Sequence, residues 1–151
     1  MPDSEENQGR KENRRFRFPK SLRLLRSEEF RAVFRSPTPA LSTRREAVAI
    51  RAKVTKKTGK VRVGVTVGKH NVPRAVDRIL AKRIMRESIR TSLPYLGEEC
   101  LQRGIGLDVS LRICESVRCG ENGQSLKIQK VRIKRSMHLC VSSLIRKIQF
   151  I

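Results

Sequence analysis

Residues 61–90 decide the fold, and they read VRVGVTVGKHNVPRAVDRILAKRIMRESIR. At their start, from Val61 to Val67, valines alternate with polar or small residues, which is the pattern of a strand with one apolar face. From Pro73 onward no glycine or further proline interrupts the chain before Pro94, and proline suits the first turn of a helix. The stretch therefore predicts a strand over 61–67 followed by a long central helix over 73–92.

The central helix carries the sharpest charge pattern in the chain. Basic residues recur along it at intervals of four, with one more beside them: Arg74, Arg78, Lys82, Arg83, Arg86 and Arg90. A step of four advances a helical side chain by about 40°, so these residues form a basic ridge. Neighbouring like charges repel by a few tenths of a kcal/mol per pair, and guanidinium groups suit bidentate contacts with phosphate. We predict that the ridge binds phosphates; a merely solvated helix face is the alternative.

An apolar row runs beside this basic ridge. Val76, Leu80 and Ile84 are expected to pack on the sheet. For Leu80 a second orientation, toward the phosphates, stays open. The last predicted helix carries a second basic group: Lys127, Lys130, Arg132, Lys134, Arg135, Arg146 and Lys147. That group is either the solvated face of an amphipathic helix or a further contact with the same polyanion.

The remaining segments predict a mixed α and β protein. Alternating residues over 48–54, joined by a glycine-containing turn to 61–67, predict a hairpin, and 107–113 predict a third strand. A helix is expected over 27–35, before Pro37 and Pro39, and another over 126–147. The segment from Pro94 to Gly104 is ambiguous, and 116–125 reads as an exposed loop. This order predicts the α+β class, as a single two-layer α/β sandwich.

Composition narrows the classes of function. The chain has 151 residues, and its 35 Lys and Arg against 14 Asp and Glu leave a formal net charge of +21, so we expect a polyanionic partner, first of all nucleic acid. Its longest apolar runs are only a few residues, which excludes a membrane span. Residues 1–17 are polar and of mixed charge, and they predict a disordered tail before one domain over 18–151. The absence of an apolar secretion signal predicts a cytoplasmic location with reduced thiols.

The cysteines and histidines allow a zinc interpretation, which we consider weak. Cys114 and Cys119 are followed by His138 and Cys140. On one helix, positions 138 and 140 lie about 200° apart and do not readily ligate one ion, so we favour free thiols and expect no metal site. The residues also show no hydrolase triad and no clustered carboxylates, so we expect no catalytic residues in the protein itself.

Two aromatic residues on the first helix leave two interpretations open. Phe30 and Phe34 lie four positions apart, on one helix face, and Arg31 and Arg35 follow them. Such a pair is either part of the core or a stacking platform for unpaired bases.

Several blocks of the chain resemble the protein subunit of bacterial ribonuclease P. The first block is FPKSLRLL at 18–25 with EFRAVF at 29–34, and the second is RVGVTVGK at 62–69, leading into AVDR at 75–78 and KRIMRE at 82–87. The family's central helix carries an Arg-Asn-Arg core followed by Lys-Arg, which Arg78, Lys82, Arg83 and Arg86 match. Ile79 and Leu80 stand where the family has Asn and Arg.

The resemblance implies a small mixed sheet whose parallel strands are joined by a left-handed crossover through the basic helix. It implies that this helix contacts a catalytic RNA, and that a cleft beside the first helix holds the 5′ leader of precursor tRNA. By position, the cleft residues would be Phe30, Phe34, Arg31, Ile50 and Lys69. Magnesium ions would be bound by the RNA and not by a protein motif.

The resemblance, together with the basic charge, therefore implies a protein subunit of ribonuclease P that would bind the catalytic RNA and precursor tRNA and promote endonucleolytic 5′ maturation of tRNA. The protein would be part of an endoribonuclease without supplying its catalytic groups. A ribosomal or other structural RNA-binding protein of the same sandwich fold is the alternative. Neither DNA nor a membrane is an expected partner.

Overall fold

The computed structural model describes residues 18–35, 41–116 and 126–150, with the side chains of 126–129 left aside. The predicted tail over 1–17, the two prolines after the first helix, and nearly all of the predicted 116–125 loop lie outside the described residues. The elements follow in the order η1 (Lys20–Leu22), α2 (Ser27–Phe34), β1 (Ser42–Arg45), β2 (Val48–Thr55), β3 (Val61–Thr66), α3 (Ala75–Arg90), α4 (Leu93–Gln102), β4 (Gly106–Ile113) and α5 (Leu126–Ile148).

The four strands form one mixed sheet in the order β1-β2-β4-β3. β2 pairs antiparallel with both β1 and β4, while β3 pairs parallel with β4. The predicted α+β class with a mixed sheet and a crossover helix is therefore confirmed. The predicted hairpin between 48–54 and 61–67 is wrong, because β4 lies between these two strands. Strand alternation identifies a strand and its faces but not its neighbours in the sheet.

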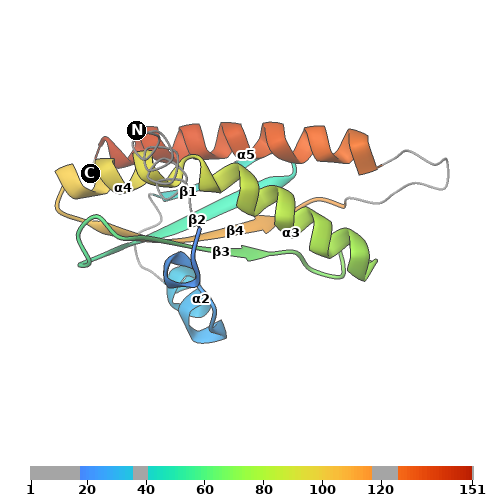
Figure 1. Ribbon diagram of the computed structural model, residues 1–151, viewed down its shortest axis with the longest axis horizontal. Helices are drawn as coiled ribbons and strands as arrows, with labels where there is room; N and C mark the ends of the chain where they lie inside the picture. Colours follow the sequence, from blue (N-terminus) through green and yellow to red (C-terminus); the bar gives the residue numbers. More distant parts are fainter. Residues whose placement is uncertain (1–17, 36–40, 117–125, 151) are drawn as a thin grey trace, which may run out of the picture.

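Helices cover the two faces of the sheet unequally (Figure 1). α3, α4 and α5 lie on one face, where they bury the apolar residues of β2, β3 and β4 in the main core. The short helix α2 lies against the opposite face. Because β3 and β4 are parallel, the chain returns between them through α3 and α4, and this return places the basic helix beside the sheet.

The hairpin of β1 and β2 was not expected from the sequence. Its turn contains Glu46 with φ 49°, a left-handed conformation that most non-glycine residues avoid. Long-range contacts hold the turn: the Ala47 N–H donates to Ser136 Oγ at 3.3 Å, and Arg135 Nη2 lies 2.9 Å from Glu46 Oε2. Residues distant in the sequence therefore fix a turn that has no glycine or asparagine.

The ambiguous segment after Leu93 forms helix α4. Pro94 lies in its first turn, where the missing N–H leaves no helical hydrogen bond unmade. The proline ends α3 and begins a new helix. Within the described residues, no helix is both long enough and apolar enough to cross a bilayer.

Candidate nucleic-acid interface

The basic ridge of α3 lies on the side of the helix that faces away from the core. The core side carries Ala81, Ile84, Met85 and Ile89, which are buried. On the ridge, the Arg74 side chain is 73% exposed and Arg83 is exposed, whereas Arg78, Lys82, Arg86 and Arg90 are partly buried. Helical periodicity thus correctly separated the charged side of the helix from its buried side.

The predicted apolar row is only partly correct. Ile84 is buried and Leu80 packs against the edge of the core, but Val76 is 69% exposed. The first turn of α3 extends beyond the end of β3, so the sheet offers Val76 nothing to pack on (Figure 1). Ile79, at the position where the family has Asn, is also exposed, at 62%.

The charges of the ridge are incompletely neutralised. Arg90 Nη2 pairs with Glu87 at 2.7 Å, Arg74 lies 3.9 Å from Asp77, and Arg78 donates to the carbonyl of Pro73 at 2.6 Å. The other three ridge residues, Lys82, Arg83 and Arg86, make no ion pair with a carboxylate in the described part of the chain. Burial, and the positive charge of Arg23, lower the pKa of Arg86. An anionic partner would stabilise this side of α3.

The two phenylalanines of α2 have different surroundings. Phe30 lies directly over Gly64 of β3, so closely that a Cβ atom at Gly64 would fall 2.3 Å from its ring. Phe34, one turn later, is 40% exposed, with the guanidinium carbons of Arg51 and Arg112 at 5.8 and 5.9 Å from its ring centroid. Phe30 is thus partly buried against the sheet, outside the main core, whereas Phe34 is the more open ring with two arginines beside it. Base stacking on this pair stays a prediction.

A small hollow of about 60 Å³ lies beside Phe34, between α2 and the sheet. Its polar lining consists of Ser42, Arg51, Ser110 and Arg112. The hydroxyl of Ser110 is buried and has no hydrogen-bond partner in the described part of the chain. An aromatic ring, two cations and an unused hydroxyl thus lie together around a hollow that is too small to enclose a base, and they suit contact with a base and its phosphate at the surface.

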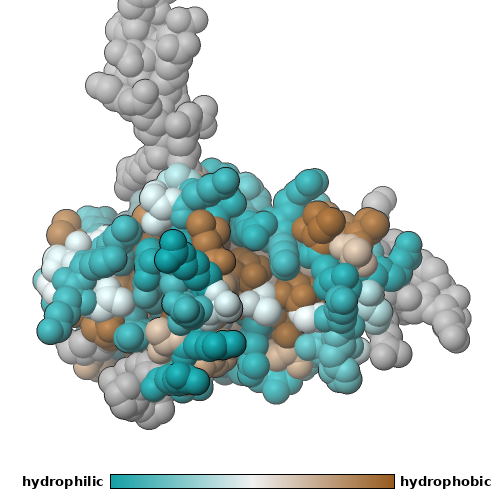
Figure 2. Space-filling view, turned by 90° about the horizontal axis from the view of Figure 1, so that it is seen from below, coloured by the Kyte–Doolittle hydropathy of each residue, from teal (hydrophilic) through white to brown (hydrophobic). Residues whose placement is uncertain are grey.

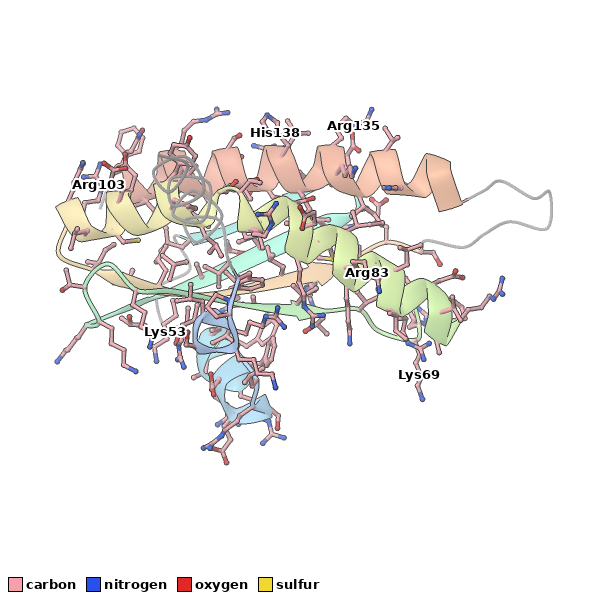
Figure 3. The ribbon with its side chains drawn as sticks, in the orientation of Figure 1. Lys53, Lys69, Arg83, Arg103, Arg135 and His138 are labelled. Atoms are coloured by element: carbon pink, nitrogen blue, oxygen red, sulfur yellow. The ribbon has the colours of Figure 1, made fainter. Side chains whose placement is uncertain are left out.

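The structure brings together only some of the residues expected in the leader cleft. Arg31 is exposed on α2, and Ile50 is among the residues that line the hollow beside Phe34, although its side chain is only 1% exposed and packs in the core on the opposite face of β2. Its role in binding the leader stays a prediction. Successive strand residues point to opposite faces, and it is Arg51 that points toward α2. Lys69 is exposed in the turn between β3 and α3, outside the hollow beside Phe34 (Figure 3).

The sequence analysis missed Ser42 and Ala49 of the hollow, and it also missed three polar residues of the two central strands: Arg51, Ser110 and Arg112. Each of these three alternates with core residues along β2 or β4 and was assigned only to the polar face of a strand. That alternation was the available signal. It placed these residues on one face, but it did not show that α2 brings an aromatic ring against them.

An ion-pair cluster fixes α2 to the sheet. Arg62 on β3 binds Asp108 on β4 through two hydrogen bonds of 2.9 and 2.8 Å, and it also reaches Glu29 on α2 at 3.0 Å. The hydrogen bond to Asp108 raises the pKa of Arg62, against the effect of burial. Since all three side chains are at most 25% exposed, this cluster holds the helix that presents Phe34.

Seen from the α2 side, the molecule is largely hydrophilic, with small hydrophobic patches between the polar groups (Figure 2). In the helical layer on the other side of the sheet, Arg135 and His138 are exposed along α5 (Figure 3), and Arg135 reaches Glu46 in the turn between β1 and β2. The second basic group therefore includes solvated residues of an amphipathic helix. Its contact with a polyanion stays a prediction.

Of the residues in the zinc interpretation, the structure describes Cys114, His138 and Cys140, while Cys119 lies outside the described residues. Cys100 and Cys140 are fully buried, and burial raises the pKa of both thiols to about 11. His138 is exposed while Cys140 lies in the core, so the two point to different sides of α5, as the helical spacing predicts. Among the described residues, no three His, Cys, Asp or Glu side chains gather in a metal-binding group.

Comparisons with known proteins agree with this geometry. The ribonuclease P protein component of Dictyoglomus turgidum is 34% identical over 115 residues, covering 76% of this chain and 83% of that relative. The component from Ralstonia pickettii is 35% identical over 96 residues, covering 64% of this chain and 60% of the relative.

The structure of the Staphylococcus aureus RNase P protein shows the same fold, with a TM-score of 0.60 at 15% identity over 82% of this chain and 94% of that chain. The family model described as ribonuclease P matches residues 18–127. This match runs from the first aromatic residue of the domain, through the α2 face and the basic helix, to the start of α5. Because the family model covers most of the chain and the fold agrees, the chain belongs to the ribonuclease P protein family.

Proposed function

We propose that this chain is the RNA-binding subunit of ribonuclease P, acting in the cytoplasm on the 5′ maturation of tRNA, with a catalytic RNA that carries out the cleavage. The ridge of α3 would contact that RNA, and the α2 face would hold the 5′ leader of precursor tRNA. One observation supports the division into two surfaces: two cationic sites, on different sides of the molecule, make no ion pair with a carboxylate among the described residues. They are Arg83 and Arg86 on α3, and Arg51 and Arg112 around Phe34.

The ridge suits a large folded RNA. Arg83 and Arg86, together with Lys82, are held on a rigid helix whose other side is anchored in the core. Each phosphate that a cation neutralises releases condensed counterions, so binding should weaken steeply with salt. Phosphate contacts position a protein on RNA without reading its sequence.

Magnesium ions would be held by the RNA. Divalent cations bind hard oxygen ligands, above all carboxylates and phosphates. The carboxylates at the sheet, Glu29 and Asp108, already bind Arg62, and the surfaces around them are cationic. The donor groups of the described residues therefore do not fit a protein-bound magnesium ion, whereas RNA phosphates supply the ligands that it prefers.

The α2 face suits a short single-stranded segment. Phe34 offers a ring that is open to solvent, and Ser110 offers a hydrogen-bonding group at the bottom of the hollow. Stacking tolerates any base, which fits leaders that differ in sequence from one tRNA to another. Mature tRNA has no leader and would not occupy this face.

The test is reconstitution with the catalytic RNA of the same organism, precursor tRNA and magnesium. The protein alone should not cleave, and the complete particle should remove the leader. Phe34→Ala should weaken the binding of precursor tRNA by about 1–3 kcal/mol and leave mature tRNA unchanged. Phe150→Ala is the matched control, since Phe150 is 91% exposed at the end of α5. Equal losses for both tRNAs would contradict the leader site.

A further inference from the structure

A second hollow, of about 360 Å³, lies between the beginning of the described chain and α3. It is lined on one side by Phe18 and Arg23, and on the other by Ile79, Arg83 and Arg86 of α3. Ligand pockets begin at about this size. This hollow is separate from the one beside Phe34, with which it shares no lining residue.

The Phe18 side of the hollow is fixed before any ligand binds. Arg23 Nη2 donates to the Phe18 carbonyl oxygen at 2.9 Å, and its guanidinium carbon lies 4.9 Å from the centre of the Phe18 ring. The backbone of this segment bonds to β3, since the Leu24 N–H donates to the Val63 carbonyl at 3.0 Å. Phe18 also packs against the core. The ring and the guanidinium are thus held as a rigid pair.

The cations of the hollow need an anion. Arg23 Nε is buried without a hydrogen-bond partner among the described residues, although a buried donor of this kind ordinarily has one. Arg86 faces the positive charge of Arg23 and is itself partly buried. Glu87 also lies at the rim, but its carboxylate is bound to Arg90. The remaining charge suits a phosphate, which accepts hydrogen bonds from two guanidinium groups at once.

The same hollow has an apolar component. Ile79 is 62% exposed among the charged residues of α3 that line the hollow, and it lies among the lining residues with Phe18. An exposed aliphatic side chain opposite an aromatic ring suits a flat ring system better than it suits a simple inorganic anion. The ligand therefore combines a planar, partly apolar ring with a phosphate.

We propose that this hollow binds one unstacked nucleotide of the ribonuclease P RNA, with its base against Phe18 and Ile79 and its phosphate against Arg23 and Arg86. This inference rests on the proposed function. The inference adds a contact with a single base to the proposed function, and this contact lies where Ile79 replaces a polar residue of the family pattern. A base held outside its helix would fix the position of α3 along the RNA, which phosphate contacts alone do not specify.

The experiment first identifies the nucleotide. Full-length protein with a benzophenone side chain in place of Phe18 is photolysed in the reconstituted particle, and the crosslinked position of the RNA is mapped. We expect one principal nucleotide in an unpaired segment. A crosslink confined to base-paired RNA, or to the protein's own chain, would overturn the proposal.

The second step tests whether the mapped base occupies the hollow. Ile79→Gln should weaken RNA binding roughly three-fold or more, whereas Val76→Gln, at the other exposed apolar residue of α3, should not. With the mapped nucleotide made abasic, Ile79→Gln should have no further effect, since the contact is already lost. Arg86→Gln should lower the slope of log affinity against log salt by roughly 0.7–0.9, and Arg86→Lys should restore it.

The outcomes separate this proposal from the proposed function. Additive effects of Ile79→Gln and the abasic site, or equal losses from Ile79→Gln and Val76→Gln, would overturn the nucleotide site while the protein still binds the RNA. Unmodified protein that neither binds nor activates the RNA would overturn the proposed function itself. Thermal melting of each variant excludes unfolding as the cause, and because both substituted residues are exposed, their melting temperatures should be unchanged.

Discussion

The two faces of the sheet differ although they are built from the same strands. Along β4, Leu107, Val109, Leu111 and Ile113 point into the main core and are at most 3% exposed. The residues between them face α2 and are polar: Asp108, Ser110 and Arg112. One set stabilises the fold through apolar burial, and the other keeps polar groups available for a ligand.

The difference arises from how much helix covers each face. Three helices cover the apolar face, while α2, with eight residues, covers part of the other. On the partly covered face, Arg62 is paired and Arg112 stays near solvent, while the Ser110 hydroxyl is buried without a hydrogen-bond partner among the described residues. The lesson is that the face with the weaker packing is the one suited to bind a ligand.

The sharpest test of this comparison uses two neighbouring residues of β4. Leu111→Ala should lower the free energy of unfolding by about 2–5 kcal/mol, because it leaves a cavity in the core. Ser110→Ala should change it by less than about 0.5 kcal/mol, since the Ser110 hydroxyl makes no hydrogen bond among the described residues. Urea unfolding measures both. Similar losses at the two positions would show that both faces stabilise the fold equally.

A smaller effect is expected at the ion-pair cluster under α2. Arg62→Met removes the cation shared by Glu29 and Asp108 and should cost about 2–3 kcal/mol, less than for a fully buried pair. The control is Arg135→Met, because the Arg135 pair with Glu46 is largely exposed and should be worth under about 1 kcal/mol. If the two variants melt alike, the cluster does not hold α2 in place.

The close approach of α2 to β3 predicts an effect of about 1–3 kcal/mol for Gly64→Ala. The new Cβ would meet the Phe30 ring at 2.3 Å, so the helix must shift. Gly68→Ala is the control, since nothing lies within 4 Å of its Cβ position. Replacing the Phe30 ring by a smaller side chain in the same variant, with Phe30→Leu, should recover part of the lost free energy of unfolding. If the stability losses of Gly64→Ala and Phe30→Leu simply added, the contact between Gly64 and the Phe30 ring would be contradicted.

The smallest expected effect concerns the reactivity of the two buried cysteines in the main core. Burial raises the pKa of Cys100 and Cys140 to about 11, so at pH 8 they should react with a thiol reagent far more slowly than the partly exposed Cys114. Because these thiols ionise more readily when unfolded, their contribution to stability is complete below about pH 8.5 and is lost as the pH rises toward 11. Rapid labelling of the variant Cys114→Ala,Cys119→Ala at pH 8 would show that the core opens.

The sequence by itself determined the elements that depend on local periodicity. The strands near 48–54, 61–67 and 107–113, the basic ridge of α3 and the opposite placement of His138 and Cys140 all follow from the spacing of residues within one segment. The family resemblance also depended on short local blocks, and the family match confirms it.

Only the tertiary structure decided which segments meet. It inserted β4 between β2 and β3, and it held Glu46 in a turn through contacts with α5. It also gave different environments to Phe30 and Phe34, which the sequence places on one helix face, because Gly64 lies under one ring and two arginines lie beside the other. The physical reason is that periodicity specifies the direction of a side chain relative to its own backbone, whereas a binding site is made by whatever the packing of distant segments places opposite it.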